Sequence, residues 1–291
     1  MHGRIVKGIA GFYYVYADNG KTYECKARGI FRKDKIKPMV GDEVSLDVLN
    51  ETEPAGNITG LLPRKSELIR PAVANVDQAL IVFALTHPEP NYMLLDKLLL
   101  QFRIQGLPVI LVFNKEDLVK ESETHRVRDI YKNSGAKVLF TCAIHGQGIE
   151  ELSEELRGRL SCVAGPSGTG KSSLINCMQD SVKAATGSIS VKAERGRHTT
   201  RHSEIIPISE DTFIMDTPGF SSFDILLDDP EELKENYEEF IQYTGCRFKP
   251  CSHTHEPGCE VKEAVDKGLI AKERYDNYSL IYSELKNSRR Y

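Results

Sequence analysis

The chain has 291 residues, of which 40% are hydrophobic, and a formal net charge of −4 at pH 7. This length predicts two or three domains, and the slightly negative charge does not by itself indicate a nucleic-acid partner. Because no apolar run reaches about 18 residues and the N-terminal residues lack the pattern of a signal peptide, we expect a cytoplasmic protein without a membrane partner.

Residues 1–64 predict a small β-barrel. Apolar and polar residues alternate in RIVKGIAGFYYVYAD, GKTYECKARG, GDEVSLDVLNE and AGNITGLLPR, with turn residues between these runs. Short strands at this spacing are typical of the five-stranded oligonucleotide-binding (OB) fold. We therefore expect residues 1–64 to form an all-β OB-fold domain, with RNA as its candidate partner.

The basic residues of this first domain support a nucleic-acid face. Lys and Arg outnumber Asp and Glu in residues 1–64, and the reverse holds in residues 223–291. A basic groove with aromatic side chains such as those of FYYVY binds single-stranded nucleic acid. Barrels of this type also bind proteins, and their tyrosines also fill cores, so both interpretations stay open. The clustered cations are Arg28, Arg32, Lys33, Lys35 and Lys37.

Residues 65–222 alternate between buried strands and helices. The apolar runs VDQALIVFAL, LPVILVFNK, AKVLFTCA, LSCVAG and TFIMDTP are typical of strands buried on both faces. Helical periodicity lies between them, in NYMLLDKLLLQFRIQG, GIEELSEELRGR and KSSLINCMQD. This alternation predicts a doubly wound α/β domain around a parallel sheet.

A phosphate-binding loop begins this domain's third predicted helix. The segment GPSGTGKSS matches G-x-x-x-x-G-K-[ST] after a buried strand. Backbone N–H groups would wrap the β-phosphate, the Lys171 ammonium would bind the β- and γ-phosphates, and the Ser172 hydroxyl would ligate magnesium. The predicted phosphate-binding residues are Gly165, Pro166, Ser167, Gly168, Thr169, Gly170, Lys171, Ser172 and Ser173.

The segment NKED predicts recognition of guanine by Asn114, Lys115, Glu116 and Asp117. The Asp117 carboxylate can accept hydrogen bonds from the N1–H and 2-amino groups of guanine. Adenine has no donor at N1, so it would leave the carboxylate unpaired at a cost of about 1–3 kcal/mol or more. The loop of Thr141, Cys142 and Ala143 would support the guanine oxygen, although an ordinary polar loop is almost as consistent with the sequence.

Two further segments predict the magnesium and γ-phosphate contacts. In DTPGF, Asp216 would hold magnesium through a water molecule, and the backbone N–H of Gly219 would contact the γ-phosphate. In RGRHTTRHS, either Thr199 or Thr200 would complete the magnesium shell. The expected ligands are therefore GTP or GDP and magnesium.

The nucleophilic water needs an orienting group that DTPGF does not supply. Many GTPases place a glutamine directly after this motif, but here the residue is Phe220, which cannot hydrogen-bond to water. His198, beside the two threonines, is the nearest candidate. A solvated loop residue and a contact to RNA phosphate are the alternatives for His198.

The order of these motifs is permuted. Base recognition comes first, followed by the supporting loop, the phosphate loop, the threonine segment and DTPGF. Because a site depends on geometry and domain termini lie near the surface, a circularly permuted sheet can form the same pocket.

Residues 223–291 predict a mainly α-helical zinc-binding domain. A helix is expected from DDPEELKENYEEF, and one further helix on each side of Gly268. Three thiols and one imidazole suffice for a closed tetrahedral zinc site with a structural role. The predicted ligands are Cys246, Cys251, His253 and Cys259, with His255 as a rival to His253; Cys25, Cys142, Cys162 and Cys177 are expected in cores.

The permuted order, with GPSGTGKSSLIN, RGRHTT, DTPGF and CRFKPCSHTHEPGCEVKEAVDKGLI, resembles the ribosome small subunit-dependent GTPase A family over practically the whole chain. The resemblance implies a GTP hydrolase that binds the small ribosomal subunit and its rRNA in late maturation. It further implies hydrolysis stimulated by the subunit and coupled to release, one structural zinc held through His253, and a catalytic role for His198. No DNA partner is expected, and the absence of heptads favours a monomer.

Two other functions compete with this interpretation. One is a nucleotide-gated RNA- or protein-binding switch whose slow hydrolysis is incidental. The other is a metabolic P-loop kinase, which is disfavoured because nothing marks a small-substrate pocket and NKED recognises guanine.

Overall fold

The computed structural model describes residues 1–27, 37–50, 52, 54–68, 72–186, 204–216, 225, 227 and 229–288, with the backbone alone for 182–186 and 216. The chain forms two compact units. The first contains residues 1–78, 150–163 and 174–220, and the second contains residues 79–149, 164–173 and 221–291. Within the described ranges, every helix is too short or too polar to cross a lipid bilayer.

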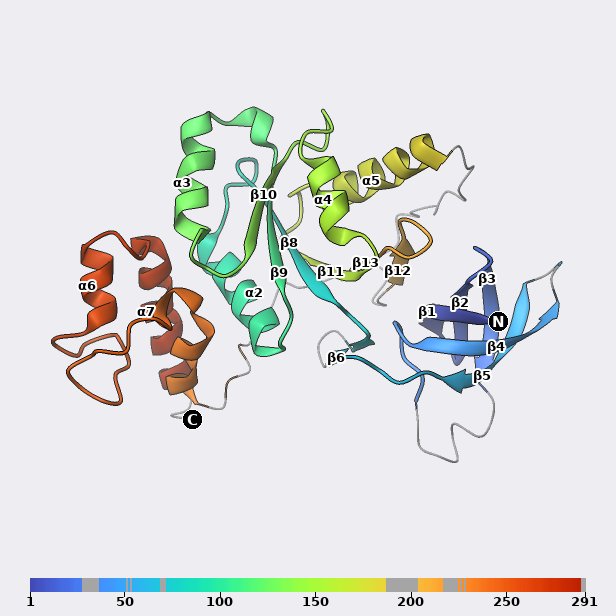
Figure 1. The fold of residues 1–291 in the computed structure, drawn as a ribbon, viewed down its shortest axis with the longest axis horizontal. Helices are drawn as coiled ribbons and strands as arrows, with labels where there is room; N and C mark the ends of the chain where they lie inside the picture. Colours follow the sequence, from blue (N-terminus) through green and yellow to red (C-terminus); the bar gives the residue numbers. More distant parts are fainter. Residues whose placement is uncertain are drawn as a thin grey trace. The chain divides into compact units, whose positions relative to one another are not determined.

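The predicted N-terminal barrel is confirmed (Figure 1). Alternate side chains point inward, so that Ile5, Val15, Tyr23, Val44 and Ile58 are fully buried. The barrel closes in the order β1-β2-β3-β5-β4, and its strands are β1 (His2–Ile9), β2 (Phe12–Ala17), β3 (Thr22–Ala27), β4 (Glu43–Asn50) and β5 (Ala55–Leu61). A short hairpin of β6 (Glu67–Leu68) and β7 (Val73–Ala74) follows.

A six-stranded mixed sheet carries the predicted nucleotide motifs. Its order is β10-β9-β8-β11-β13-β12. The β10/β9, β9/β8 and β11/β13 pairs are parallel, whereas β12 runs antiparallel to β13. The strands are β8 (Gln78–Ala84), β9 (Val109–Asn114), β10 (Lys137–Thr141), β11 (Leu160–Ala164), β12 (Glu204–Pro207) and β13 (Phe213–Asp216). All five predicted strands are present. Strand β12 was not predicted, because its four residues do not alternate between apolar and polar side chains.

The helices of this α/β region follow from caps and apolar stripes. Helix α2 (Tyr92–Ile104) begins after Asn91, whose side chain accepts a hydrogen bond of 3.0 Å from the Leu94 N–H. Its buried stripe has helical spacing and consists of Leu95, Leu98, Leu99 and Phe102. Helices α4 (Ile149–Leu156) and α5 (Lys171–Thr186) were predicted, but α3 (Glu121–Tyr131) was not, because its buried face is short.

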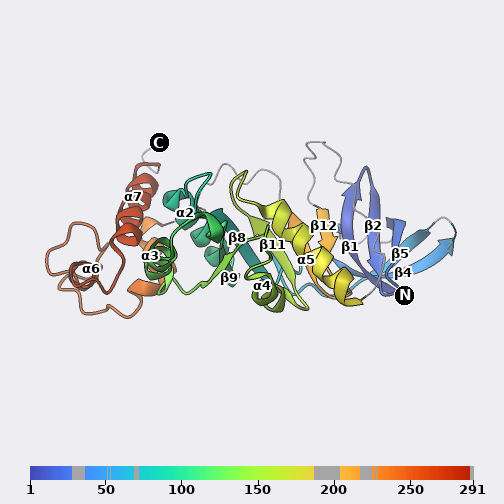
Figure 2. The same cartoon turned by 90° about the horizontal axis from the view of Figure 1, so that it is seen from above.

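The C-terminal region is helical, with one correction to its predicted elements. The segment after Asp229 forms two 3₁₀ helices, η2 (Pro230–Asn236) and η3 (Glu238–Phe240), and no α-helix. Tyr237 is extended between them, which lets its fully buried ring stack on Phe240. Helices α6 (Glu260–Asp266) and α7 (Lys272–Ser288) flank Gly268 as predicted, and α7 lies alongside α2 and α3 in both views (Figures 1 and 2). The domain boundaries at 64/65 and 222/223 stay predictions.

Candidate functional site

The phosphate loop connects the end of β11 to the first turn of α5. Gly165, Gly168 and Gly170 have φ angles of 137°, 80° and 96°, a backbone region that strongly favours glycine. A Cβ on Gly165 would collide with the carbonyl oxygen of Val82, and a Cβ on Gly170 would collide with the side chain of Asn114. The glycines therefore let the loop lie close to the ends of β8 and β9.

The other residues of the loop divide into buried and exposed positions. Lys171 Nζ donates hydrogen bonds to the carbonyl oxygens of Gly165 (2.8 Å) and Pro166 (2.7 Å), so the ammonium group lies over the loop. Thr169 is buried, and its hydroxyl donates to the same Pro166 carbonyl at 3.1 Å. The exposed residues are Ser167, Gly168, Ser172 and Ser173.

Asn114, the last residue of β9, joins three of the predicted motifs. Its Nδ2 donates to the Thr169 carbonyl oxygen at 3.0 Å. Its Oδ1 accepts hydrogen bonds from the Thr141 hydroxyl and the Ala143 N–H, each at 3.2 Å. Asn114 is 2% exposed, so these bonds fix the phosphate loop, the NKED motif and the Thr141–Ala143 loop against one another.

Lys115 makes a second connection to the phosphate loop. Its φ of 67° turns the chain out of β9 into the 3₁₀ helix η1 (Glu116–Leu118). Its Nζ donates to the Gly168 carbonyl oxygen at 2.9 Å and also to the His87 carbonyl oxygen. The Lys115 side chain therefore covers the loop that would hold the phosphates.

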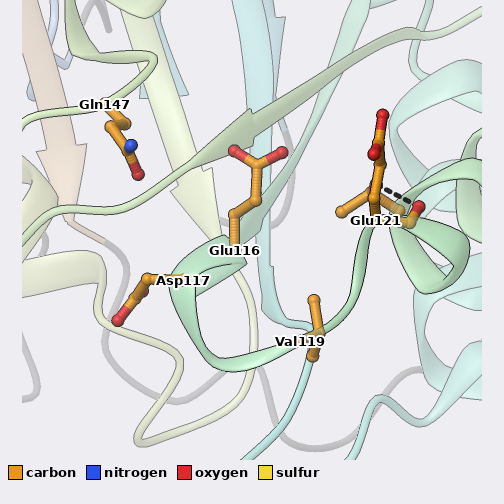
Figure 3. A pocket seen from close by; sticks show the side chains of 6 residues that line it. Glu116, Asp117, Val119, Glu121 and Gln147 are labelled. Carbon is orange, nitrogen blue, oxygen red and sulfur yellow. Dashed lines mark hydrogen bonds between the residues drawn. The ribbon is translucent and has the colours of Figure 1, made fainter.

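A pocket of about 350 Å³ lies beside η1. Figure 3 shows Glu116 between Gln147 and Glu121, with Asp117 on the side of Gln147. Asp117 is exposed, and its carboxylate lies within 4.8 Å of the buried Cys142 thiol. Because three of the lining residues are carboxylic acids, the pocket favours a ligand rich in N–H donors. Its lining consists of Glu116, Asp117, Val119, Glu121, Thr124 and Gln147.

Asp216 is the last residue of β13, where it is in register with Val163 of β11. Because these strands are parallel, the Asp216 backbone lies at the same carboxyl edge of the sheet as Val163. The other predicted contacts lie outside the described residues: His198, Thr199 and Thr200 in 187–203, and Gly219 with Phe220 in 217–224. The same is true of Arg28, Arg32, Lys33 and Lys35.

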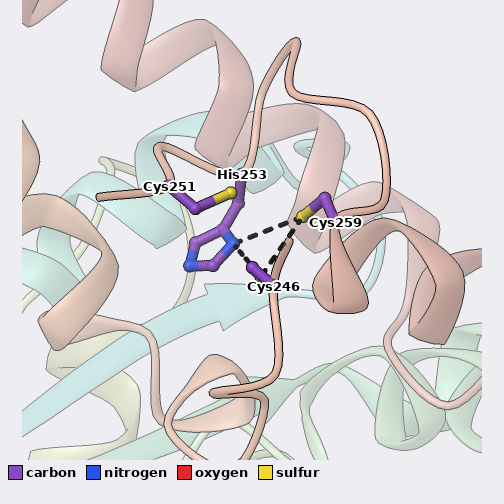
Figure 4. A group of neighbouring side chains, drawn as sticks. All are labelled: Cys246, Cys251, His253 and Cys259. Atoms are coloured by element: carbon purple, nitrogen blue, oxygen red, sulfur yellow. Dashed lines mark hydrogen bonds between the residues drawn. The ribbon is translucent and has the colours of Figure 1, made fainter. Parts of the chain in front are cut away.

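The four predicted zinc ligands form one buried cluster (Figure 4). His253 Nδ1 lies 3.6 Å from Cys246 Sγ and 3.3 Å from Cys259 Sγ, and the two sulfurs are 4.0 Å apart. Tetrahedral zinc with ordinary bond lengths places ligand atoms about 3.5–3.8 Å apart, so the arrangement fits this metal.

Burial raises the pKa of the Cys251 thiol to about 12 and lowers the pKa of His253. His255, the rival ligand, is exposed and lies outside the cluster.

Helix α7 holds the loop that carries these ligands. The Tyr275 hydroxyl donates to the His253 carbonyl oxygen at 2.9 Å, and the Tyr278 hydroxyl donates to the Ser252 carbonyl oxygen at 2.6 Å. His253 has a φ of 58°, a strained value for a residue with a side chain. The two tyrosines stabilise this conformation and aim the imidazole at the cysteines.

Comparisons with known proteins assign the chain to a family. A family model described as RsgA GTPase matches residues 61–226, and one described as RsgA N-terminal domain matches residues 2–56. The chain belongs to the RsgA GTPase family. A curated RsgA relative from Agathobacter rectalis, named small ribosomal subunit biogenesis GTPase, is 53% identical over 302 residues, with 100% of both chains covered. One of the same name from Caldanaerobacter subterraneus subsp. tengcongensis is 47% identical, with 100% of this chain and 98% of the relative covered.

Solved structures agree with membership of the RsgA family. YjeQ from Thermotoga maritima has a TM-score of 0.79 and 36% identity, with 98% of each chain covered. YloQ, described as a circularly permuted GTPase, has a TM-score of 0.76 and 32% identity, with 99% of this chain and 95% of that chain covered. The predicted family resemblance and fold class are therefore confirmed.

Two features of the RsgA-type site were not predicted from the sequence. Gln147 lines the pocket, and the His87 carbonyl accepts from Lys115. The available signal for Gln147 was the glycine on each side of it, since Gly146 and Gly148 have φ angles of 73° and 70°. No pattern in the sequence indicates the role of the His87 carbonyl.

Proposed function

We propose that this chain is a GTPase of small ribosomal subunit biogenesis that hydrolyses GTP while bound to the maturing subunit and then leaves it. The observation that carries the proposal is the bonding of Asn114, which links the guanine motif to the phosphate loop despite their permuted order. The names of the RsgA relatives supply the process. The part of the proposal in which the subunit stimulates hydrolysis rests on the family resemblance of the sequence motifs.

The guanine base would occupy the pocket beside η1, with its donors facing Asp117. The pocket's acidic lining supports this placement. Thr141, Cys142 and Ala143 would face the guanine oxygen through their main chain. The phosphates would lie along Gly165–Ser173, where Lys171 supplies the positive charge.

Magnesium would be held by the Ser172 hydroxyl, by one of Thr199 and Thr200, and through water by Asp216. The exposed position of Ser172 at the first turn of α5 supports this assignment. When bound, magnesium neutralises charge on the β- and γ-phosphates. His198 would orient the attacking water in place of the glutamine that Phe220 replaces, and Gly219 would contact the γ-phosphate.

The Cys246, Cys251, His253 and Cys259 cluster would hold one structural zinc ion. All four ligands are buried, so the metal would have no open position and would stabilise the loop without taking part in hydrolysis. The loop contributes few apolar side chains of its own, and the metal would replace that missing core.

Purified protein should contain about one equivalent of zinc, and Cys251→Ser should lose it. A buried serine cannot replace the thiolate, so the variant should unfold the C-terminal loop and lower the melting temperature by about 5 °C or more. Metal analysis and thermal denaturation measure both effects. His255→Ala is the matched control and should keep the zinc. Less than half an equivalent in wild-type protein purified without chelator would contradict the assignment.

The outer face of the barrel would contact ribosomal RNA. Phe12 and Tyr14 are half-buried on β2, whereas the core is filled by Val15 and Tyr23. The Lys26 ammonium lies 5.0 Å from the centroid of the Phe12 ring. A cation beside partly exposed aromatic rings suits a surface that binds phosphates and stacks bases.

Lys26→Gln should weaken binding to purified small ribosomal subunits. Loss of one phosphate contact should lower affinity several-fold and reduce the slope of log K against log salt by about 1. Co-sedimentation with a non-hydrolysable GTP analogue at several salt concentrations measures both quantities. Lys132→Gln, at the exposed C-cap of α3, is the matched control and should bind as wild type does. An unchanged salt slope in Lys26→Gln would exclude this contact.

A further inference from the structure

A second group of metal-binding side chains lies beside the guanine pocket. Asp117, Cys142 and His145 each offer one ligand atom, and these three atoms lie within 4.8 Å of one another. Asp117 belongs to η1, and the other two belong to the loop after β10. Asp117 and His145 are exposed, whereas Cys142 is buried, so a cation could reach the group from solvent.

The loop that carries Cys142 and His145 is fixed at both ends. The Cys142 N–H donates to the Gln147 carbonyl oxygen at 3.0 Å, which closes the loop. Gly146 and Gly148 take positive φ angles of 73° and 70°, and a Cβ on Gly148 would collide with the Phe140 carbonyl oxygen. The loop therefore holds the thiol and the imidazole on the side of Asp117 before any ligand binds.

The donor set selects the kind of cation. A thiol sulfur, an imidazole nitrogen and a carboxylate oxygen together suit zinc, whereas magnesium prefers oxygen ligands alone. Three protein ligands leave one position of a tetrahedral ion open, in contrast to the closed cluster at Cys246. A cation here would therefore exchange more readily than the structural zinc.

We propose that Asp117, Cys142 and His145 bind a zinc ion in the nucleotide-free protein, and that this ion competes with the guanine base. Competition follows because the Asp117 carboxylate cannot both ligate zinc and accept the guanine N–H donors. Binding releases the Cys142 thiol proton to solvent. The competitive step rests on the proposed placement of guanine at Asp117, but the metal site itself does not.

Zinc stoichiometry in nucleotide-free protein tests the site directly. After dialysis against a zinc-buffered solution, wild-type protein should hold two equivalents of zinc. One of them should lie in the buried Cys246, Cys251, His253 and Cys259 cluster. His145→Ala should keep only one, because it removes a ligand without touching the groups assigned to nucleotide binding. His125→Ala removes a histidine that is 65% exposed elsewhere in the same unit and should keep two. A single equivalent in wild-type protein that still binds GDP would overturn the proposal and leave the proposed function intact.

Displacement by nucleotide tests the competition. GDP should release the second equivalent and leave the first, and the apparent dissociation constant for fluorescent GDP should rise in proportion to free zinc above the affinity of the site. A certain free zinc concentration should raise this dissociation constant tenfold in wild-type protein. The same tenfold rise in His145→Ala should require about ten times that concentration. If two equivalents bind and GDP displaces neither, competition is overturned and guanine does not lie at Asp117.

Discussion

An Asp117→Asn protein should bind XTP more tightly than GTP, the reverse of the wild-type preference. Xanthine carries a carbonyl oxygen where guanine carries its 2-amino group. The asparagine amide can donate to that oxygen, but it cannot accept both guanine donors as the carboxylate does. We expect GTP affinity to fall about 100-fold, or about 3 kcal/mol.

Competition between the two nucleotides for a fluorescent analogue measures this preference. Glu121→Gln is the matched control, because Glu121 lines the same pocket but is 85% exposed and has no assigned contact to the base. It should leave both affinities within about twofold of wild type. Unchanged GTP selectivity in Asp117→Asn would show that the base is recognised elsewhere.

An Arg274→Met protein should lose a large part of its folding stability. Arg274 is 1% exposed on α7, where its Nη1 bonds Asp96 Oδ1 at 2.5 Å and its Nε bonds Glu239 Oε1 at 2.7 Å. Both carboxylates are buried: Asp96 lies on α2 and Glu239 lies on η3. Removing the cation leaves two buried negative charges unpaired, which costs about 3–5 kcal/mol of unfolding free energy.

The destabilisation of Arg274→Met should be larger at pH 8 than at pH 5. Burial raises the pKa of Asp96, and Arg274 is the strongest of the groups that oppose the rise. Without Arg274 the folded pKa of Asp96 lies further above its unfolded value, so the folded state holds an extra proton and stability falls as pH rises between the two values.

Urea denaturation at the two pH values measures both effects. Lys272→Met is the control on the same helix, because its pair with Asp276 is exposed, and it should leave the unfolding free energy nearly unchanged. Equal stability of Arg274→Met and wild type would mean that α7 does not depend on this ion pair.

The sequence predicted those parts of the site that depend on local pattern. The phosphate loop, the NKED turn and the strands before them were predicted because each combines a buried run with residues of restricted backbone geometry. The grouping of Cys246, Cys251, His253 and Cys259 was predicted because these residues lie within one short segment; zinc as their metal stays a prediction. In each case the local structure is encoded in neighbouring residues.

Features that depend on tertiary contacts were not accessible in this way. Nothing local marks Asn114 as the link between three motifs, because its partners Thr141 and Thr169 are distant in sequence. The pairing of Asp96 with Arg274 spans 178 positions and leaves no periodic signal. The 3₁₀ geometry after Asp229 follows from burial of Tyr237 and Phe240, which outweighs the capping signal that predicted an α-helix.

The central claim is that this chain hydrolyses GTP in response to the small ribosomal subunit, and turnover measured with and without purified subunits tests it most directly. We predict an increase of at least about tenfold that is specific to GTP over ATP, and that is mostly lost in His198→Ala protein still bound to the subunit. No stimulation by the subunit, with GTP binding intact, would contradict the account and favour a nucleotide-gated binding switch whose hydrolysis is incidental.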